Sequence, residues 1–289
     1  LCQRWSKWFR YGHAGLSRNK TDAEKSCNAA RMTIELYRRY RRALKAAPWT
    51  GRIMPYGWSP FPQTLYWEPF LYSEMLNDYA REIANSINDL THRERRLRAW
   101  AAVLKGLTPR KVMDAQHELI ADVATVGLGL PYVIRSRFLF ATAHLSHQAN
   151  RARLSDWSDD LPTDENIYME TADRFGRGWR RYRRLAQRLQ RIGGGDFRAS
   201  KGDFRNRYQH RFPQRVSQGL TQLVSREVGE GGAVSYGIGG RAPLHLDDIA
   251  DALVVQRDRS YAAFDAFRAL VDEQASLMLD KWPQPGSES

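Results

Sequence analysis

The strongest structural signal in the sequence is a set of long segments whose apolar residues recur every three to four positions. The clearest covers residues 68–103, and its apolar stripe consists of Leu71, Met75, Tyr79, Ile83 and Ile87. A C-terminal segment, Asp247 to Asp280, has the same spacing. This period is that of an α-helix packed on a core. The chain is therefore predicted to be an all-α bundle of long helices.

Proline and glycine divide the remaining sequence into further elements. Prolines at the first turn predict one helix from Pro109 to Val126 and a separate one from Pro131 to about Leu154. A basic helix is predicted over residues 167–192, and Gly193–Gly195 should end it. A shorter helical piece is expected over residues 201–212. The glycine-rich segment 221–243 shows alternating polarity, which predicts a β-hairpin or a flap.

The N-terminal part differs in composition from the rest of the chain. We expect a helix over residues 22–46, followed by a Pro- and aromatic-rich loop over residues 48–69 that packs through its Trp and Tyr rings. The sequence thus suggests two parts. Residues 1–60 would form a basic N-terminal helical extension with the aromatic loop, and residues 61–289 would form the helical bundle.

The composition limits the classes of function. No apolar run approaches the roughly 18 residues of a membrane-spanning helix, and no apolar leader begins the sequence, so a cytoplasmic location away from membranes is expected. Two cysteines cannot form a disulfide scaffold, and no Cys–His cluster has the spacing of a zinc site. No nucleotide-binding glycine motif is present either, so neither a cofactor nor a metal is expected.

The net charge of +13 points to an anionic partner. Arginine supplies 37 of the 45 basic residues, and its planar guanidinium group suits phosphate. A GC-rich coding sequence would produce the same excess. The distribution is uneven, because residues 1–50 carry net +9 and residues 166–191 net +6, whereas residues 243–289 carry net −5. RNA is the favoured partner.

Two helices concentrate this charge. The first carries Arg38, Arg39, Arg41 and Arg42, and the second carries Arg180, Arg181, Arg183 and Arg184, with Trp179 and Tyr182 between them. These rings could stack on bases while the arginines bind phosphates. Alternatively, each helix has a solvated basic face and directs its aromatic rings into the core. The second interpretation suits either helix alone, whereas the two helices together favour a polyanion.

The segment 204–213, FRNRYQHRFP, contains the sharpest candidate site. Three Arg–His pairs in the chain have a spacing of five to seven residues, and they begin at Arg110, Arg137 and Arg205. Only in the third does a polar residue, Asn206, follow the arginine directly, with His210 completing the motif. This arrangement resembles the RNA-cleaving motif of HEPN domains. Membership would imply a helical bundle, a homodimer whose motifs face each other, and metal-independent cleavage.

The chemistry of these three residues suits RNA cleavage. His210 would act as general acid or base on a ribose 2′-hydroxyl, and Arg205 would stabilise charge on the scissile phosphate. Asn206 lies four residues before His210, so its amide could fix the ring tautomer. Pro213 is expected to end this helix. The alternative is that His210 only caps the helix end by bonding a free carbonyl.

A second polar stripe follows the helix predicted from Pro131, with Arg137, His144 and His147 on one side. It could face the Arg205–His210 segment and hold the RNA backbone. The alternative is a purely structural role, in which the two histidines are hydrogen-bonded inside the bundle. Two histidines alone do not make a metal site.

The leading hypothesis is a HEPN-like, metal-independent endoribonuclease, a toxin or phage-defence effector that acts as a homodimer. An antitoxin or another protein partner would accompany it. The alternative is a non-catalytic, Arg-rich helical module that binds nucleic acid or protein.

Overall fold

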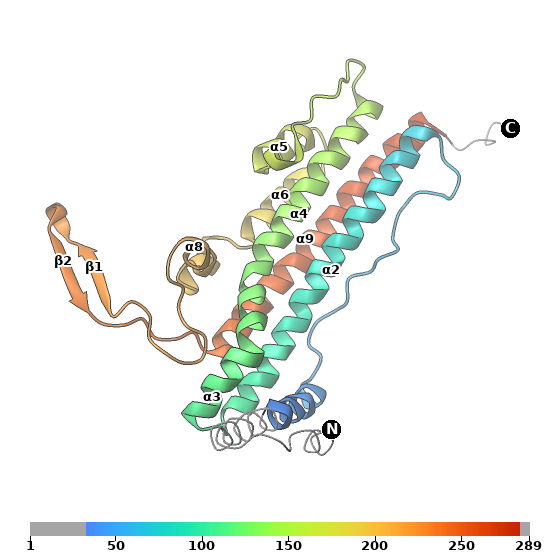
Figure 1. The fold of residues 1–289 in the computed structure, drawn as a ribbon. Helices are drawn as coiled ribbons and strands as arrows, with labels where there is room; N and C mark the ends of the chain where they lie inside the picture. The colour runs from blue at the N-terminus through green and yellow to red at the C-terminus, as the bar shows by residue number, and fades with distance from the viewer. Residues whose placement is uncertain (1–32, 284–289) are drawn as a thin grey trace, which may run out of the picture.

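The structure, a computed structural model, describes residues 33–283 and has an all-α architecture, as predicted. Three long helices form its body: α2 (Trp67–Leu104), α4 (Ala121–Arg153) and α9 (Leu246–Lys281). Helix α2 runs in one direction, and α4 and α9 run in the other (Figure 1). The bounds of α2 and α9 agree with the predicted bounds to within a residue.

Shorter elements surround this three-helix body. A helix over residues 33–46 precedes it, and the predicted start of that helix lies outside the described residues. The other elements are α3 (Pro109–Ala115), the π-helical turn Gln116–Ile120, the 3-10 turn Asp164–Asn166, α5 (Met169–Gly176), α6 (Tyr182–Arg191), α7 (Gly195–Ser200), α8 (Phe204–His210), β1 (Val224–Val228), the 3-10 turn Glu230–Gly232 and β2 (Val234–Ile238). The two strands form an antiparallel hairpin, which confirms the prediction for the glycine-rich segment.

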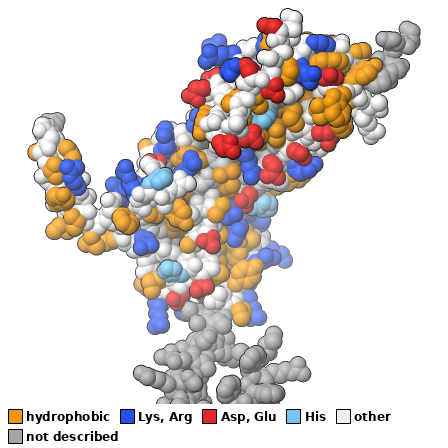
Figure 2. All heavy atoms as spheres, turned by 45° about the horizontal axis from the view of Figure 1, so that its top comes forward, with side chains coloured by type: hydrophobic (Ala, Val, Ile, Leu, Met, Phe, Trp, Pro, Cys, Tyr) orange, Lys and Arg blue, Asp and Glu red, His pale blue; other side chains and the backbone are white. Residues whose placement is uncertain are grey.

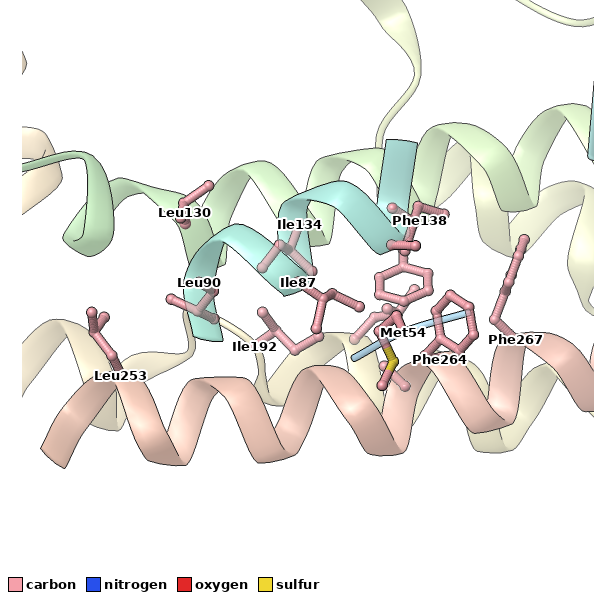
Figure 3. Close-up of a cluster of buried hydrophobic side chains, with 14 of the residues drawn as sticks. Met54, Ile87, Leu90, Leu130, Ile134, Phe138, Ile192, Leu253, Phe264 and Phe267 are labelled. Atoms are coloured by element: carbon pink, nitrogen blue, oxygen red, sulfur yellow. The ribbon is translucent and has the colours of Figure 1, made fainter. Parts of the chain in front are cut away.

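The core lies between the three long helices. Figure 3 shows Leu90 of α2, Ile134 and Phe138 of α4, and Phe264 and Phe267 of α9 converging on one cluster. All five side chains are buried. Each helix presents its apolar stripe to the other two, so burial of these stripes is the main stabilising contribution in the fold.

The segment between residues 46 and 67 has no regular secondary structure and runs along the bundle. Met54 is buried, and the side-chain amide of Asn88 holds its backbone: Met54 N–H donates to Asn88 Oδ1 at 2.7 Å, and Asn88 Nδ2 donates to the Met54 carbonyl at 3.3 Å. The Trp58 ring meets the Phe264 ring edge-on at 5.7 Å. The loop is therefore anchored on the core at Met54 and Trp58. The prediction that it packs through its Trp and Tyr rings is wrong for most of them, which are exposed: Trp49, Tyr56, Tyr66 and Trp67.

The predicted helix boundary at Pro131 is wrong, because α4 continues through this proline. Proline cannot donate a hydrogen bond and its ring crowds the carbonyl one turn earlier. That carbonyl belongs to Gly127, whose missing side chain also lets α9 approach, since a Cβ there would lie 3.1 Å from Leu253 Cδ1. Burial of apolar residues on both sides of Pro131 outweighs the lost hydrogen bond.

The single basic helix predicted over residues 167–192 is also wrong, since α5 ends at Gly176 and α6 starts only at Tyr182. Glu273 of α9 explains the break. Its carboxylate accepts the backbone N–H groups of Arg180 at 3.0 Å and Arg181 at 2.9 Å, groups that a continuous helix would bond internally. The predicted stop is confirmed: Gly193 follows α6 with a φ of +60°.

We expect Asn88→Ala to lower the free energy of unfolding by about 2–4 kcal/mol, because it leaves two buried backbone groups of Met54 without partners. Urea denaturation measures this loss. Asn85→Ala is the matched control, since Asn85 is exposed on the same helix and should change stability by less than about 0.5 kcal/mol. Equal losses in the two variants would contradict the assignment.

Candidate nucleic-acid interface

Helix α8 lies against the outer side of α4, and a pocket of about 380 Å³ opens between them. Residues of both helices line it: Thr125, Gly129, Tyr132, Val133, Ser136 and Arg137 from α4, and Phe204, Arg205, Tyr208 and Gln209 from α8. The sequence patterns predict Arg137 and Arg205 as members of two separate candidate sites. The fold brings the two arginines together in one pocket.

The two guanidinium groups are held differently. Arg137 donates to the Glu82 carbonyl at 2.9 Å and to Ser86 Oγ, and forms an ion pair with the Glu82 carboxylate at 3.1 Å. Its side chain nevertheless remains 41% exposed. The Arg205 guanidinium lies over the Tyr132 ring, 4.9 Å from its centre, and Arg205 is exposed. Arg137 is therefore anchored, while Arg205 is free to meet a ligand.

Aromatic rings form the rest of the pocket. Tyr208 is exposed, and its ring stacks on the buried Phe204 ring with centres 5.8 Å apart and planes inclined by 17°. Tyr132 supports Arg205, and Val133 adds an exposed aliphatic surface. A flat, solvent-facing tyrosine supported from beneath is a suitable platform for a planar ligand.

A tight turn sets the direction of α8. Gly202 and Asp203 both adopt left-handed backbone angles, with φ of 58° and 52°. Glycine takes this conformation without strain, and aspartate tolerates it better than most residues. The Asp203 N–H donates to the Arg198 carbonyl at 2.7 Å, which closes the turn between α7 and α8. The turn thereby directs Phe204 into the core.

The predicted motif residues lie on α8 but do not interact as expected. The Asn206 amide donates to Asp203 Oδ2 at 2.9 Å instead of bonding His210, so it does not fix the ring tautomer. The imidazole ring of His210 is exposed and has no hydrogen-bond partner among residues 33–283, so the capping alternative is not observed either. The helix ends at His210, ahead of Pro213, as predicted. His210 lies next to the pocket residue Gln209 but does not line the pocket.

The two histidines of α4 belong to a different environment. His147 is buried, its Nε2 lies 3.0 Å from Asp159 Oδ1, and its ring meets those of Trp157 and Phe175. His144 lies against Phe140, with its Nε2 3.4 Å from Asp164 Oδ1 but without hydrogen-bond geometry. Both face the segment 157–175 instead of α8. The interpretation of a hydrogen-bonded histidine inside the bundle fits His147 but not His144, which is only partly buried and whose Nε2 has no hydrogen-bond partner among the described residues. The interpretation of a stripe facing the motif fits neither.

The second basic cluster has its aromatic rings in the core. Trp179 and Tyr182 are buried. Trp179 Nε1 donates to Asn150 Oδ1 at 3.1 Å, and the Tyr182 hydroxyl donates to Asp173 Oδ1 at 2.6 Å. These rings cannot stack on bases, which supports the solvated-face interpretation. The guanidinium groups are exposed at Arg180, Arg181, Arg183 and Arg184, as they are at Arg38, Arg39, Arg41 and Arg42.

Two broader features bear on metals and membranes. Within residues 33–283 no group of three or more His, Cys, Asp or Glu side chains could hold a metal ion.

One helical stretch, Pro109–Arg153, is long and apolar enough to span a membrane by length and composition alone. This corrects the expectation that no such run exists, and it follows from the continuity of α4 through Pro131. In the most apolar window of the stretch, 44% is buried inside the fold.

Comparisons with models of known families, with curated proteins and with solved structures found no match to this chain. The HEPN resemblance therefore stays a prediction that rests on Arg205, Asn206 and His210.

Burial lowers the pKa of His144 below the ordinary histidine value of 6.5, although Asp164 opposes this shift. The folded chain then binds fewer protons at His144 than the unfolded chain. Its contribution to stability is complete above pH 6.5 and is lost as the pH falls through the folded pKa. We expect a ring NMR titration to give a pKa below 6.5 and His144→Gln to weaken the loss of stability below pH 6.5. The control is His92→Gln, a substitution at an exposed histidine, which should leave the pH dependence of stability unchanged. If His144→Gln also left it unchanged, this account would be contradicted.

Proposed function

We propose that this chain binds single-stranded RNA in the pocket between α4 and α8. The observation that carries the proposal is the convergence of Arg137 and Arg205, from two different helices, beside the exposed ring of Tyr208. Guanidinium groups bind phosphate through paired, charge-assisted hydrogen bonds. An aromatic platform next to them accepts an unpaired base by stacking.

The size and character of the pocket favour a nucleotide unit. Its volume of about 380 Å³ lies within the usual range of small-molecule sites, roughly 300–1,000 Å³. Its lining combines tyrosine rings and aliphatic groups with the Gln209 amide and the Ser136 hydroxyl, which offer donors and acceptors to a base edge. A base in a duplex is stacked and paired, so the site suits a single strand.

The charge around α8 supports an anionic ligand. Partial burial, together with the nearby charges of Arg241 and Arg211, lowers the pKa of Arg207, and Asp203 only partly opposes this. Like charges held close together destabilise one another. A phosphate bound near α8 would relieve the repulsion between these arginines. The affinity of the chain for such a ligand should therefore be higher at low ionic strength.

Fluorescence anisotropy with a labelled single-stranded RNA oligomer tests the proposal. We expect Arg205→Ala to weaken binding about 10-fold and to reduce the slope of log Kd against log salt concentration by about one. Tyr208→Ala should weaken binding by about 1–3 kcal/mol with an unchanged salt slope, because stacking releases no counterions.

Arg110→Ala is the control for bulk charge, since Arg110 is exposed on α3 and does not line the pocket. It removes the same charge and should change the affinity less than twofold. If Arg110→Ala and Arg205→Ala weaken binding equally, the attraction is diffuse and the pocket is not the site.

Cleavage of the bound RNA is the second candidate function, a HEPN-like endoribonuclease. The observation that favours it is the exposed ring of His210, at the end of the helix that carries Arg205, which no side chain of the described part of the chain engages. His210 would accept the proton of the ribose 2′-hydroxyl, whose oxygen would attack the phosphorus and displace the 5′-oxygen, and this leaving oxygen would take up a proton to become a 5′-hydroxyl. Arg205 would stabilise the charge on the phosphate. As a toxin or phage-defence effector, the protein would act on cytoplasmic RNA under the control of an antitoxin, as the resemblance implies.

Incubation of the purified protein with single-stranded RNA in EDTA tests the second candidate. We expect fragments that end in a 2′,3′-cyclic phosphate, identified by mass spectrometry. His210→Ala should abolish them, and the variant His245→Ala, an exposed histidine outside the motif, should leave them unchanged. Cleavage that survives His210→Ala would remove this candidate and leave the binding proposal intact.

A further inference from the structure

The hairpin of β1 and β2 projects from the bundle and packs on none of the long helices (Figure 1). Figure 2 shows hydrophobic side chains along it, exposed to solvent. A two-stranded hairpin without a further strand or a covering helix is marginally stable in water. The exposed side chains and the free backbone edges of the hairpin therefore indicate what kind of further strand or helix would stabilise it.

The hairpin has one apolar face. Residues opposite each other share a face of the sheet, and the register pairs Val224 with Ile238, Arg226 with Tyr236 and Val228 with Val234. All the apolar members of this face are exposed, up to 89% at Ile238. The other face consists of Ser225, Glu227, Ser235 and Gly237.

The outer edge of β2 offers a regular set of backbone groups. The Gly239 N–H donates to the Leu223 carbonyl at 2.8 Å, so this pair is of the hydrogen-bonded kind. The two kinds of pair alternate along an antiparallel ladder. The backbone N–H and C=O groups of Val234, Tyr236 and Ile238 therefore point away from β1, toward the free edge.

Nothing in β2 protects this edge. Natural edge strands carry charged residues, proline or a bulge that prevents pairing with another chain, and Val234-Ser-Tyr-Gly-Ile238 contains none of these. The strand is also symmetric in polarity about Tyr236, with an apolar residue at each end and small residues between. An antiparallel pair of identical strands centred on Tyr236 would thus match apolar with apolar residues.

We propose that β2 pairs antiparallel with β2 of a second copy of this chain, about a two-fold axis at Tyr236. The hydrogen-bonded pairs would join Tyr236 to Tyr236 of the partner subunit, and Val234 to Ile238 of the partner subunit. The central pair is aromatic, which is favourable across strands. The β1 edge is less suitable, since the same symmetry would place Arg226 opposite the partner's Arg226.

The product is a four-stranded sheet shared by two subunits, a self-complementary interface of the closed, two-fold kind. The hairpin joins the segment after α8 through the Thr221–Arg241 bridge, so the shared sheet links two α4–α8 pockets in one assembly. The pairing depends on β2 alone and does not require that the pocket binds RNA.

Sedimentation equilibrium of the full chain tests the pairing. The wild-type protein should be a dimer, and Tyr236→Glu and Tyr236→Lys should each be monomeric, because like charges then meet at the axis. An equimolar mixture of the two variants should dimerise, since glutamate then faces lysine. A variant that merely unfolds the hairpin would not be rescued in this way.

Arg226→Glu is the matched control, because it alters the same hairpin face on the strand that does not pair between subunits, and it should remain dimeric. A monomeric wild type, dimers that persist in both Tyr236 variants, or a mixture that stays monomeric would each overturn the proposal. RNA affinity is measured on the same variants. Monomeric variants that still bind RNA show that the pocket works without the pairing, and dimers that do not bind RNA show that the pairing holds although the RNA site fails.

Discussion

The mutual burial of the apolar stripes of α2, α4 and α9 is the constraint on which the rest of the molecule depends. Helix α4 turns Ile134 and Phe138 toward the other two helices. Helical geometry then places Tyr132 and Val133 away from the core, while Arg137 lies beside α2, bonded to Glu82. The same packing that forms the core therefore presents one wall of the pocket. Helix α8 supplies the other wall and is anchored by the buried ring of Phe204.

Buried polar contacts fix how the three helices align. Gln274 of α9 accepts the Tyr72 hydroxyl of α2 at 2.6 Å and donates to Ser146 Oγ of α4 at 3.0 Å. Apolar surfaces slide against each other at little cost, whereas a displaced helix would leave these buried groups unpaired. One amide thus links α2, α4 and α9 and helps to fix their relative positions.

Local patterns in the sequence predicted the local features of the fold. The periodicity of residues 68–103 and 247–280, the stop at Gly193 and the hairpin are all encoded within a few turns of chain. The errors arose where distant residues decide the outcome. Packing on both sides carries α4 through Pro131, and Glu273 interrupts the basic segment from 93 residues away along the chain.

The same distinction applies to the site. The sequence identified Arg137 and Arg205 individually, but only the fold shows that they share a pocket. It missed Tyr132, Tyr208 and Gln209, for which no local pattern distinguishes a pocket residue from a core or surface residue. It also grouped His144 and His147 with Arg137, because helical spacing alone does not show that the loop containing Asp159 and Asp164 faces them.

The central claim, that Arg137 and Arg205 bind one RNA strand together, is tested most directly by a double-mutant cycle on RNA affinity. The affinities of Arg137→Ala, Arg205→Ala and the double variant give the coupling between the two side chains. Contact with neighbouring parts of one ligand predicts non-additive losses, with a coupling of about 0.5–3 kcal/mol. Losses that add to within about 0.5 kcal/mol, or no loss in either single variant, would contradict the account.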